Sequence, residues 1–123
     1  MRKLTVLFLT FLMTGLAFGT DYHISTQADF DLYRDATFSP GDNILFERGQ
    51  VFTGMFEPRG SGTPGNVITI SAYGTGAMPV IHNNGVFHPH PLRPTVSDDE
   101  ICACILLFNV EYWEVNNIEC TNY

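Results

Sequence analysis

The chain has 123 residues, with 13 aspartates and glutamates against 6 lysines and arginines, and its formal net charge at pH 7 is −7. An acidic chain of this kind repels phosphate backbones and anionic lipid, so its composition excludes nucleic acid and membrane surfaces as expected partners. Its length suggests one domain, and its hydrophobic content of 45% is enough to build a core.

Residues 1–19 have the pattern of a secretory signal peptide. Met1-Arg2-Lys3 is a positive start, Leu4 to Phe18 is mostly apolar, and Ala17-Phe18-Gly19 places small residues before a cleavage site at Thr20. An uncleaved membrane anchor is the alternative, but the apolar segment is shorter than the ~20 residues of a spanning helix. We therefore expect a secreted protein, extracellular or periplasmic, with residues 20–123 as the mature part.

The mature part is predicted to begin with a short strand and a helix. Residues 21–26 have strand character, and residues 27–37 look helical because Phe30, Tyr33 and Ala36 recur at three-residue steps. Thr26 is the expected N-cap, and Asp29 lies in the first turn, where the helix dipole stabilises a carboxylate by ~0.3–1 kcal/mol.

Short strands separated by turns are predicted next. Asn43 to Glu47 places Ile44 and Phe46 on one face, and Phe52 to Glu57 is another strand candidate. Val67 to Ile70 and Pro79 to Ile81 each follow a glycine-containing turn, and glycine reaches left-handed turn conformations cheaply. Because strand side chains alternate, Ile68 and Ile70 should both point inward.

The spacing of apolar positions hints at a repeat. Ile44 and Ile68 are 24 residues apart (68 − 44), and Val80 and Ile105 are 25 apart (105 − 80). Repeat architectures use periods of roughly 20–50 residues. Two intervals alone do not establish a repeat, so this interpretation depends on the family resemblance described below.

Residues 82–100 interrupt this rhythm. We expect His82 to Gly85 and the proline-rich run Phe87 to Pro94 to form a loop that does not pair in a sheet, because proline donates no backbone hydrogen bond. Ile101 to Phe108 is the most apolar run, and strand-like segments follow at 112–115 and 118–120, with asparagines at the expected corners: Asn109, Asn116, Asn117 and Asn122. No polar capping segment follows Cys120, so we expect the chain to be the first coils of something longer.

Three segments carry a family resemblance: Pro40 to Gly49, Arg59 to Ile81 and Val110 to Val115. Their pattern, PGDxIxFxRG … GSGTPGNxITIxAYGxGxxPVI … VEYWEVxN, resembles the N-terminal part of the secreted pectate-lyase-like superfamily, over roughly residues 22–123. The resemblance implies an all-β, right-handed parallel β-helix whose first coil is covered by the 27–37 helix. It also implies asparagine ladders at one corner, with Asn117 and Asn122 as candidates.

Two polar constellations could bind metals. His82, His88 and His90 include imidazoles that suit zinc or copper, but nothing completes a site with recognisable spacing, which favours ordinary loop histidines. Asp98-Asp99-Glu100 offers oxygen ligands for Ca²⁺, which the family resemblance also suggests, yet it lacks the alternating calcium-loop pattern, which favours solvated acids.

The cysteines and aromatic residues leave alternatives open. Cys102 and Cys104 share a strand face and are poor partners for each other; either could meet Cys120 on the next coil, or all three are buried apolar residues. Tyr112, Trp113 and Tyr123 could stack on sugar rings, although alternation favours Trp113 in the core and Tyr112 outside.

We therefore expect the N-terminal portion of a secreted β-helix protein that acts on polysaccharide, as a lyase or a hydrolase. Family lyases use calcium or arginine with a basic residue, but no lysine follows residue 19, so we assign no catalytic, cofactor or metal residue to this segment and expect it to be inactive alone. Glycine-rich residues 60–65 precede a strand and are a turn rather than a phosphate loop. The alternative is a non-catalytic adhesion or glycan-binding β-helix. The expected partners are polysaccharide and the downstream coils of the same β-helix.

Overall fold

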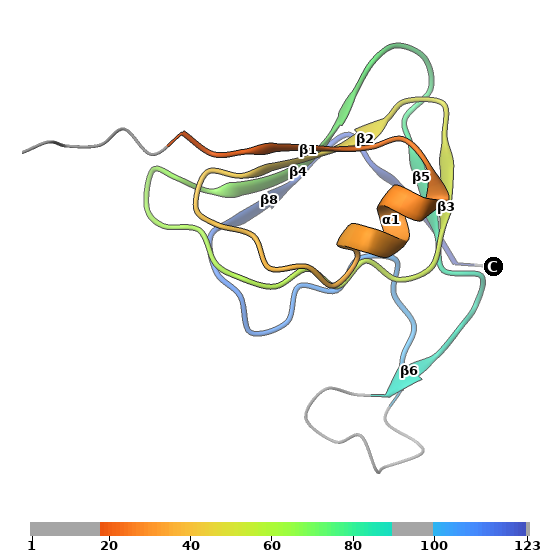
Figure 1. Ribbon diagram of the computed structural model, residues 1–123. Helices are drawn as coiled ribbons and strands as arrows, with labels where there is room; N and C mark the ends of the chain where they lie inside the picture. Colours follow the sequence, from red (N-terminus) through yellow and green to blue (C-terminus); the bar gives the residue numbers. More distant parts are fainter. Residues whose placement is uncertain (1–17, 90–99, 123) are drawn as a thin grey trace, which may run out of the picture.

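The computed structural model describes residues 18–89 and 100–122, and this part of the chain is mostly strands with one short helix (Figure 1). Most of the expected signal peptide, residues 1–17, lies outside it. No helix in the described ranges is long and apolar enough to cross a membrane. The elements are β1 (Asp21–Ile24), α1 (Gln27–Tyr33), β2 (Asn43–Glu47), β3 (Val51–Thr53), β4 (Ile68–Tyr73), β5 (Val80–His82), β6 (His88–Pro89), β7 (Glu100–Ile101), β8 (Trp113–Val115) and β9 (Glu119–Thr121).

The chain winds between two parallel sheets. One has the order β1-β2-β4-β8 and the other β3-β5-β9, so β2, β4 and β8 are each followed along the chain by a strand of the second sheet. Parallel neighbours need long connections, and here each connection is the remainder of a coil. A third side is joined by the bridges Thr37↔Arg59 and Phe56↔Ile105. Figure 1 shows the resulting stack, with α1 against the coils and β6 projecting away from them.

The core lies inside the coils. Ile44 pairs with Ile70 in the first sheet, Phe52 pairs with Ile81 in the second, and all four side chains are buried. Ile68 is buried as well, which confirms the predicted inward orientation of Ile68 and Ile70. The buried cluster comprises Ile24, Phe30, Phe38, Ile44, Phe46, Phe52, Phe56, Ile68, Ile70, Ile81 and Cys104.

Helix α1 covers this core, and its predicted N-cap is confirmed. The Asp29 backbone N–H donates to the Thr26 hydroxyl at 3.1 Å, and the Thr26 N–H donates to the Asp29 carboxylate at 3.0 Å, which completes a capping box. The buried Phe30 ring stacks against Phe52, with ring centroids 5.9 Å apart. The helix is shorter than predicted because the carbonyl groups of Arg34 and Ala36 accept hydrogen bonds from the next coil instead.

One prediction about strands is wrong. The strand expected from Phe52 to Glu57 ends at Thr53, because Gly54 turns the chain at φ 125° beside the Phe30 ring. Between successive coils, Ile44 pairs with Ile70, and Val80 pairs with Glu119. Register follows the inward rows of side chains, and the segment between β5 and β8 makes the later coil much longer than the earlier ones.

The loop and corner predictions have mixed outcomes. The expectation that His82 to Gly85 and Phe87 to Pro94 do not pair is wrong at two places. His82 ends β5 and pairs with Thr53 and Thr121, because the inward row of Phe52 and Ile81 extends the sheet to it. His88–Pro89 pairs antiparallel to Glu100–Ile101, because a two-stranded edge tolerates the missing proline donor. Asn109 and Asn117 have positive φ values of 53° and 56°, which confirms them as corners. Asn117 donates to Asn116 and Ser71, whereas Asn122 bonds to Cys102, so Asn117 and Asn122 do not stack as a ladder.

Candidate functional site

A groove opens where two successive coils separate on the third side. The two segments are joined by a hydrogen bond from Leu106 N–H to the Phe56 carbonyl oxygen at 2.9 Å, and again from Gly62 N–H to the Glu111 carbonyl oxygen at 3.0 Å. Between these points Asn109 takes its left-handed conformation and diverts the later segment. The resulting inter-coil groove has a volume of about 290 Å³ and is lined by Glu57, Pro58, Arg59, Gly60, Phe108, Asn109 and Val110.

One wall of the inter-coil groove, formed by residues 57–60, is held in place by hydrogen bonds to the preceding coil. The backbone N–H groups of Glu57 and Arg59 donate to the carbonyl oxygens of Arg34 at 2.7 Å and Ala36 at 2.9 Å. Gly60 has φ 93°, and a Cβ atom there would lie 2.1 Å from the Phe38 carbonyl oxygen, so only glycine fits this close approach. The wall is therefore a rigid part of the fold.

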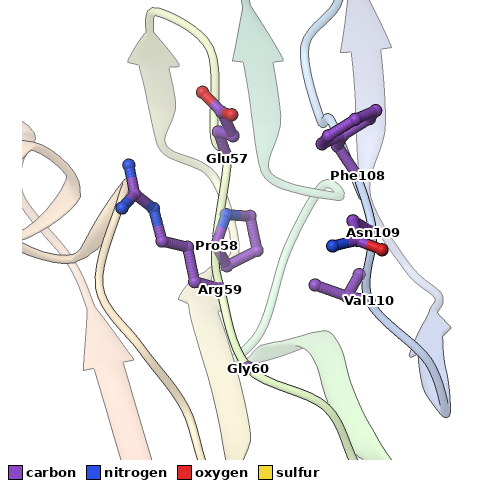
Figure 2. Close-up of a pocket in the computed structure, with 7 residues that line it drawn as sticks. All are labelled: Glu57, Pro58, Arg59, Gly60, Phe108, Asn109 and Val110. Carbon is purple, nitrogen blue, oxygen red and sulfur yellow. The ribbon is translucent and has the colours of Figure 1, made fainter. Parts of the chain in front are cut away.

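The side chains of the groove combine apolar surface with hydrogen-bonding groups. Figure 2 shows Phe108, Asn109 and Val110 on one segment facing the segment of Glu57 to Gly60 across the groove, with the Arg59 side chain extending away from Phe108. The Phe108 ring offers a flat apolar face, Glu57 accepts hydrogen bonds, and the Asn109 amide both donates and accepts. A few polar groups beside apolar surface are typical of sites for small organic ligands.

A second groove lies on the outward face of the β3-β5-β9 sheet. It has a volume of about 300 Å³ and is lined by Val51, Val80, His82, Glu119 and Thr121. Val51, Val80 and Glu119 form one row across the three strands. His82 and Thr121 are in register, with His82 Nδ1 at 2.9 Å from the Thr121 hydroxyl oxygen, so this outer-sheet groove has an apolar floor and a polar edge.

The histidines and acids expected as possible metal ligands do not assemble in the described part of the chain. His82 lies on β5, whereas His88 lies on β6 with Nε2 at 3.4 Å from the Asn83 side-chain oxygen. Glu100 is exposed on β7, and His90, Asp98 and Asp99 lie outside the described residues. Residues 18–89 and 100–122 contain no group of three or more histidines, cysteines or acids that could hold a metal ion.

The three cysteines differ in their surroundings. All three are free thiols: Cys104 is buried, Cys102 is half-buried and Cys120 is exposed on β9. The reading of all three as buried apolar residues is therefore wrong for Cys120. Burial of the thiol, reinforced by the neighbouring Cys104, raises the pKa of Cys120 to about 11, although the residue keeps exposed surface.

The aromatic residues also divide as alternation predicts. Trp113 packs against Phe38 with ring centroids 6.1 Å apart, and its indole N–H donates to the Gly60 carbonyl oxygen at 2.9 Å. Tyr112 is exposed, and Tyr123 lies outside the described residues. The aromatic side chain in a groove is instead Phe108, whose only sequence signal is its place before the corner residue Asn109.

Comparison with known proteins identifies solved structures that this chain resembles over part of their length. No family model and no curated protein matches the chain. Two crystal structures of a GH136 lacto-N-biosidase from Eubacterium ramulus are similar to it. The selenomethionine derivative has a TM-score of 0.64 and 27% identity over 85% of this chain and 20% of that chain; the native protein has a TM-score of 0.59 and 26% identity over 84% and 20%. The chain thus spans about a fifth of the length of the solved proteins it matches.

Proposed function

We propose that this chain is the N-terminal cap and first coils of a secreted, right-handed parallel β-helix protein that hydrolyses glycosidic bonds. The observation that carries this proposal is the similarity to a glycoside hydrolase over 85% of the chain, in fold and with 27% identity. Residues 1–19 would be the cleaved signal peptide, and residues 20–123 would form the beginning of the β-helix domain. The remaining coils would belong to the rest of the same protein.

The charge of the chain favours a neutral glycan over a polyuronate. The formal net charge is −7, and each groove carries a carboxylate, Glu57 in one and Glu119 in the other. A carboxylate-bearing sugar would meet like charge in both places, whereas sugar hydroxyls can donate to these oxygens. A neutral substrate also agrees with the name of the similar solved protein, a lacto-N-biosidase, whereas a uronate lyase would need a charged substrate.

The grooves are suited to hold sugar rather than to cleave it. Glycoside hydrolases generally use two carboxyl groups roughly 5–10 Å apart on either side of the scissile bond. The lining residues of each described groove include one carboxylate. We therefore assign glycan contact to the inter-coil groove, with Phe108 as the stacking surface, and place the catalytic pair in later coils.

The single carboxylate among the lining residues of each groove also favours a second candidate, a β-helix that binds glycan without cleaving it.

An activity assay distinguishes the two candidates. Purified protein from the gene that carries this chain should be incubated with a chromogenic lacto-N-bioside, with other neutral glycosides and with polygalacturonate. We expect release of the chromophore and no unsaturated uronate. Binding of neutral glycan without any release would support the non-catalytic candidate, and unsaturated products from polygalacturonate would contradict both.

A further inference from the structure

Two of the three cysteines lie together on the inner side of the later coil. Cys120 pairs in register with Ile81, which pairs in turn with Phe52, and both of these side chains are buried. Cys120 thus continues an inward row. Cys104 belongs to the buried core, and its Sγ atom donates to the Thr121 carbonyl oxygen at 2.9 Å, one residue from Cys120. After burial of the thiol itself, Cys104 contributes to raising the pKa of the Cys120 thiol.

The third cysteine is held by other partners. The Asn122 amide nitrogen donates to Cys102 Sγ at 2.9 Å and to the Cys102 carbonyl oxygen at 3.3 Å. The buried Asn83 side chain also donates to Cys102 Sγ, at 3.6 Å. Cys102 therefore bonds to Asn122, whereas Cys104 bonds to Thr121, the residue next to Cys120. The two cysteines thus have different partners on β9 and just after it.

We propose that Cys104 and Cys120 form an intramolecular disulfide when the chain meets a small-molecule disulfide, and that Cys102 stays a free thiol. The Cys120 thiolate, on the more exposed residue, attacks one sulfur of the oxidant and releases its first thiol. Cys104 then attacks the Cys120 sulfur of the mixed disulfide and releases the second thiol. Two cysteine thiols are oxidised, one small disulfide is reduced to two thiols, and the two cysteine protons end on these products.

The crosslink would enclose the later wall of the inter-coil groove. Residues 108–110 and the Trp113 side chain, which bonds to Gly60, lie between the two joined cysteines in the chain. A disulfide restricts the unfolded chain and so favours the folded arrangement of the segment it closes. Oxidation would therefore hold Phe108 opposite Glu57 more firmly than the thiol form does.

The test uses the full chain, folded, with oxidised glutathione as the probe. Proteolysis without reduction followed by mass spectrometry should yield one crosslinked pair of peptides, containing residues 104 and 120, with one titratable thiol left. The matched control Cys102→Ser should form the same crosslink and leave no titratable thiol. Cys104→Ser should form no crosslink within the chain, and the same oxidation in urea should scramble the pairing.

A crosslink that involves Cys102, or three free thiols after prolonged oxidation of the folded chain, would each overturn the proposal.

Discussion

The indole N–H of Trp113 donates to the carbonyl oxygen of Gly60 at 2.9 Å, across 53 residues of chain. This bond connects β8 to Gly60, which is part of the wall of the inter-coil groove. The Trp113 ring packs against Phe38 of the earlier coil at the same time. One side chain thus links three successive coils at the edge of the candidate site.

Replacement of this indole should destabilise the chain while keeping its aromatic packing. In Trp113→Phe the Gly60 carbonyl oxygen loses its donor, and we expect a loss of roughly 1–3 kcal/mol in the free energy of unfolding, measured by urea denaturation. Tyr112→Phe is the matched control, because Tyr112 is exposed and its change should stay within about 0.5 kcal/mol. Equal losses for the two variants would contradict a structural role for the indole bond.

Gly60 should be far less tolerant of a side chain than Gly65. Both have positive φ, 93° and 79°, but an added Cβ at position 60 meets the Phe38 carbonyl oxygen, whereas nothing lies within 4 Å at position 65. Gly65→Ala should cost only the conformational strain of about 1–2 kcal/mol. Gly60→Ala should cost more than about 3 kcal/mol and lower the melting temperature accordingly. Similar melting temperatures for the two variants would show that the close approach is not rigid.

Ile68 and Thr69 test the orientation of β4. Ile68 is fully buried, and its truncation to alanine should cost ~2–5 kcal/mol through lost burial and a cavity. Aspartate at position 68 should prevent folding, whereas aspartate at position 69, on the outward side of the strand, should be much better tolerated. Circular dichroism with chemical denaturation measures both, and equal tolerance would refute the inward assignment.

The capping box predicts a pH-dependent contribution to stability. Hydrogen bonds from the Ser25 backbone first, and from Thr26, lower the pKa of Asp29 below its usual value. The folded state therefore favours the charged form, so this contribution is present above the ordinary aspartate range and is lost as pH falls through the lowered pKa. Asp29→Asn should flatten the acid side of the stability profile, and an unchanged profile would contradict this.

The other half of the capping box is the Thr26 hydroxyl. Thr26→Ala should lower the free energy of unfolding by about 1 kcal/mol at neutral pH, measured by urea denaturation.

The proposed glycan contact rests on Phe108 and Glu57. Phe108→Ala should lower the affinity for a bound neutral oligosaccharide about tenfold, near 1.4 kcal/mol, in isothermal titration. Glu57→Gln keeps the shape of the side chain and should weaken binding less than Phe108→Ala. Arg48→Ala is the matched control, since Arg48 is not among the residues that line this groove. Loss of affinity in Arg48→Ala alone would place the sugar outside the groove.

Local features of this protein could be predicted from its sequence because they depend on neighbours in the chain. Thr26 and Asp29 are three residues apart and complete their capping box within one helical turn. The alternation of Ile44 and Phe46 determined which face of β2 is buried. Asn109 and Asn117 tolerate the left-handed backbone that a corner requires, so their identity alone marked the turns.

The tertiary structure decided every relationship between coils. The pairing of Ile44 with Ile70 depends on how whole rows of side chains pack, which residue spacing cannot specify. The same holds for Glu57 and Phe108, which line one groove only because the later coil departs from the earlier one at Asn109. From the sequence, either Cys102 or Cys104 could meet Cys120; the fold brings Cys104 to Thr121, next to Cys120, and Cys102 to Asn122. Such contacts join residues far apart in the chain, and their geometry follows from the register of the stacked coils rather than from local preference.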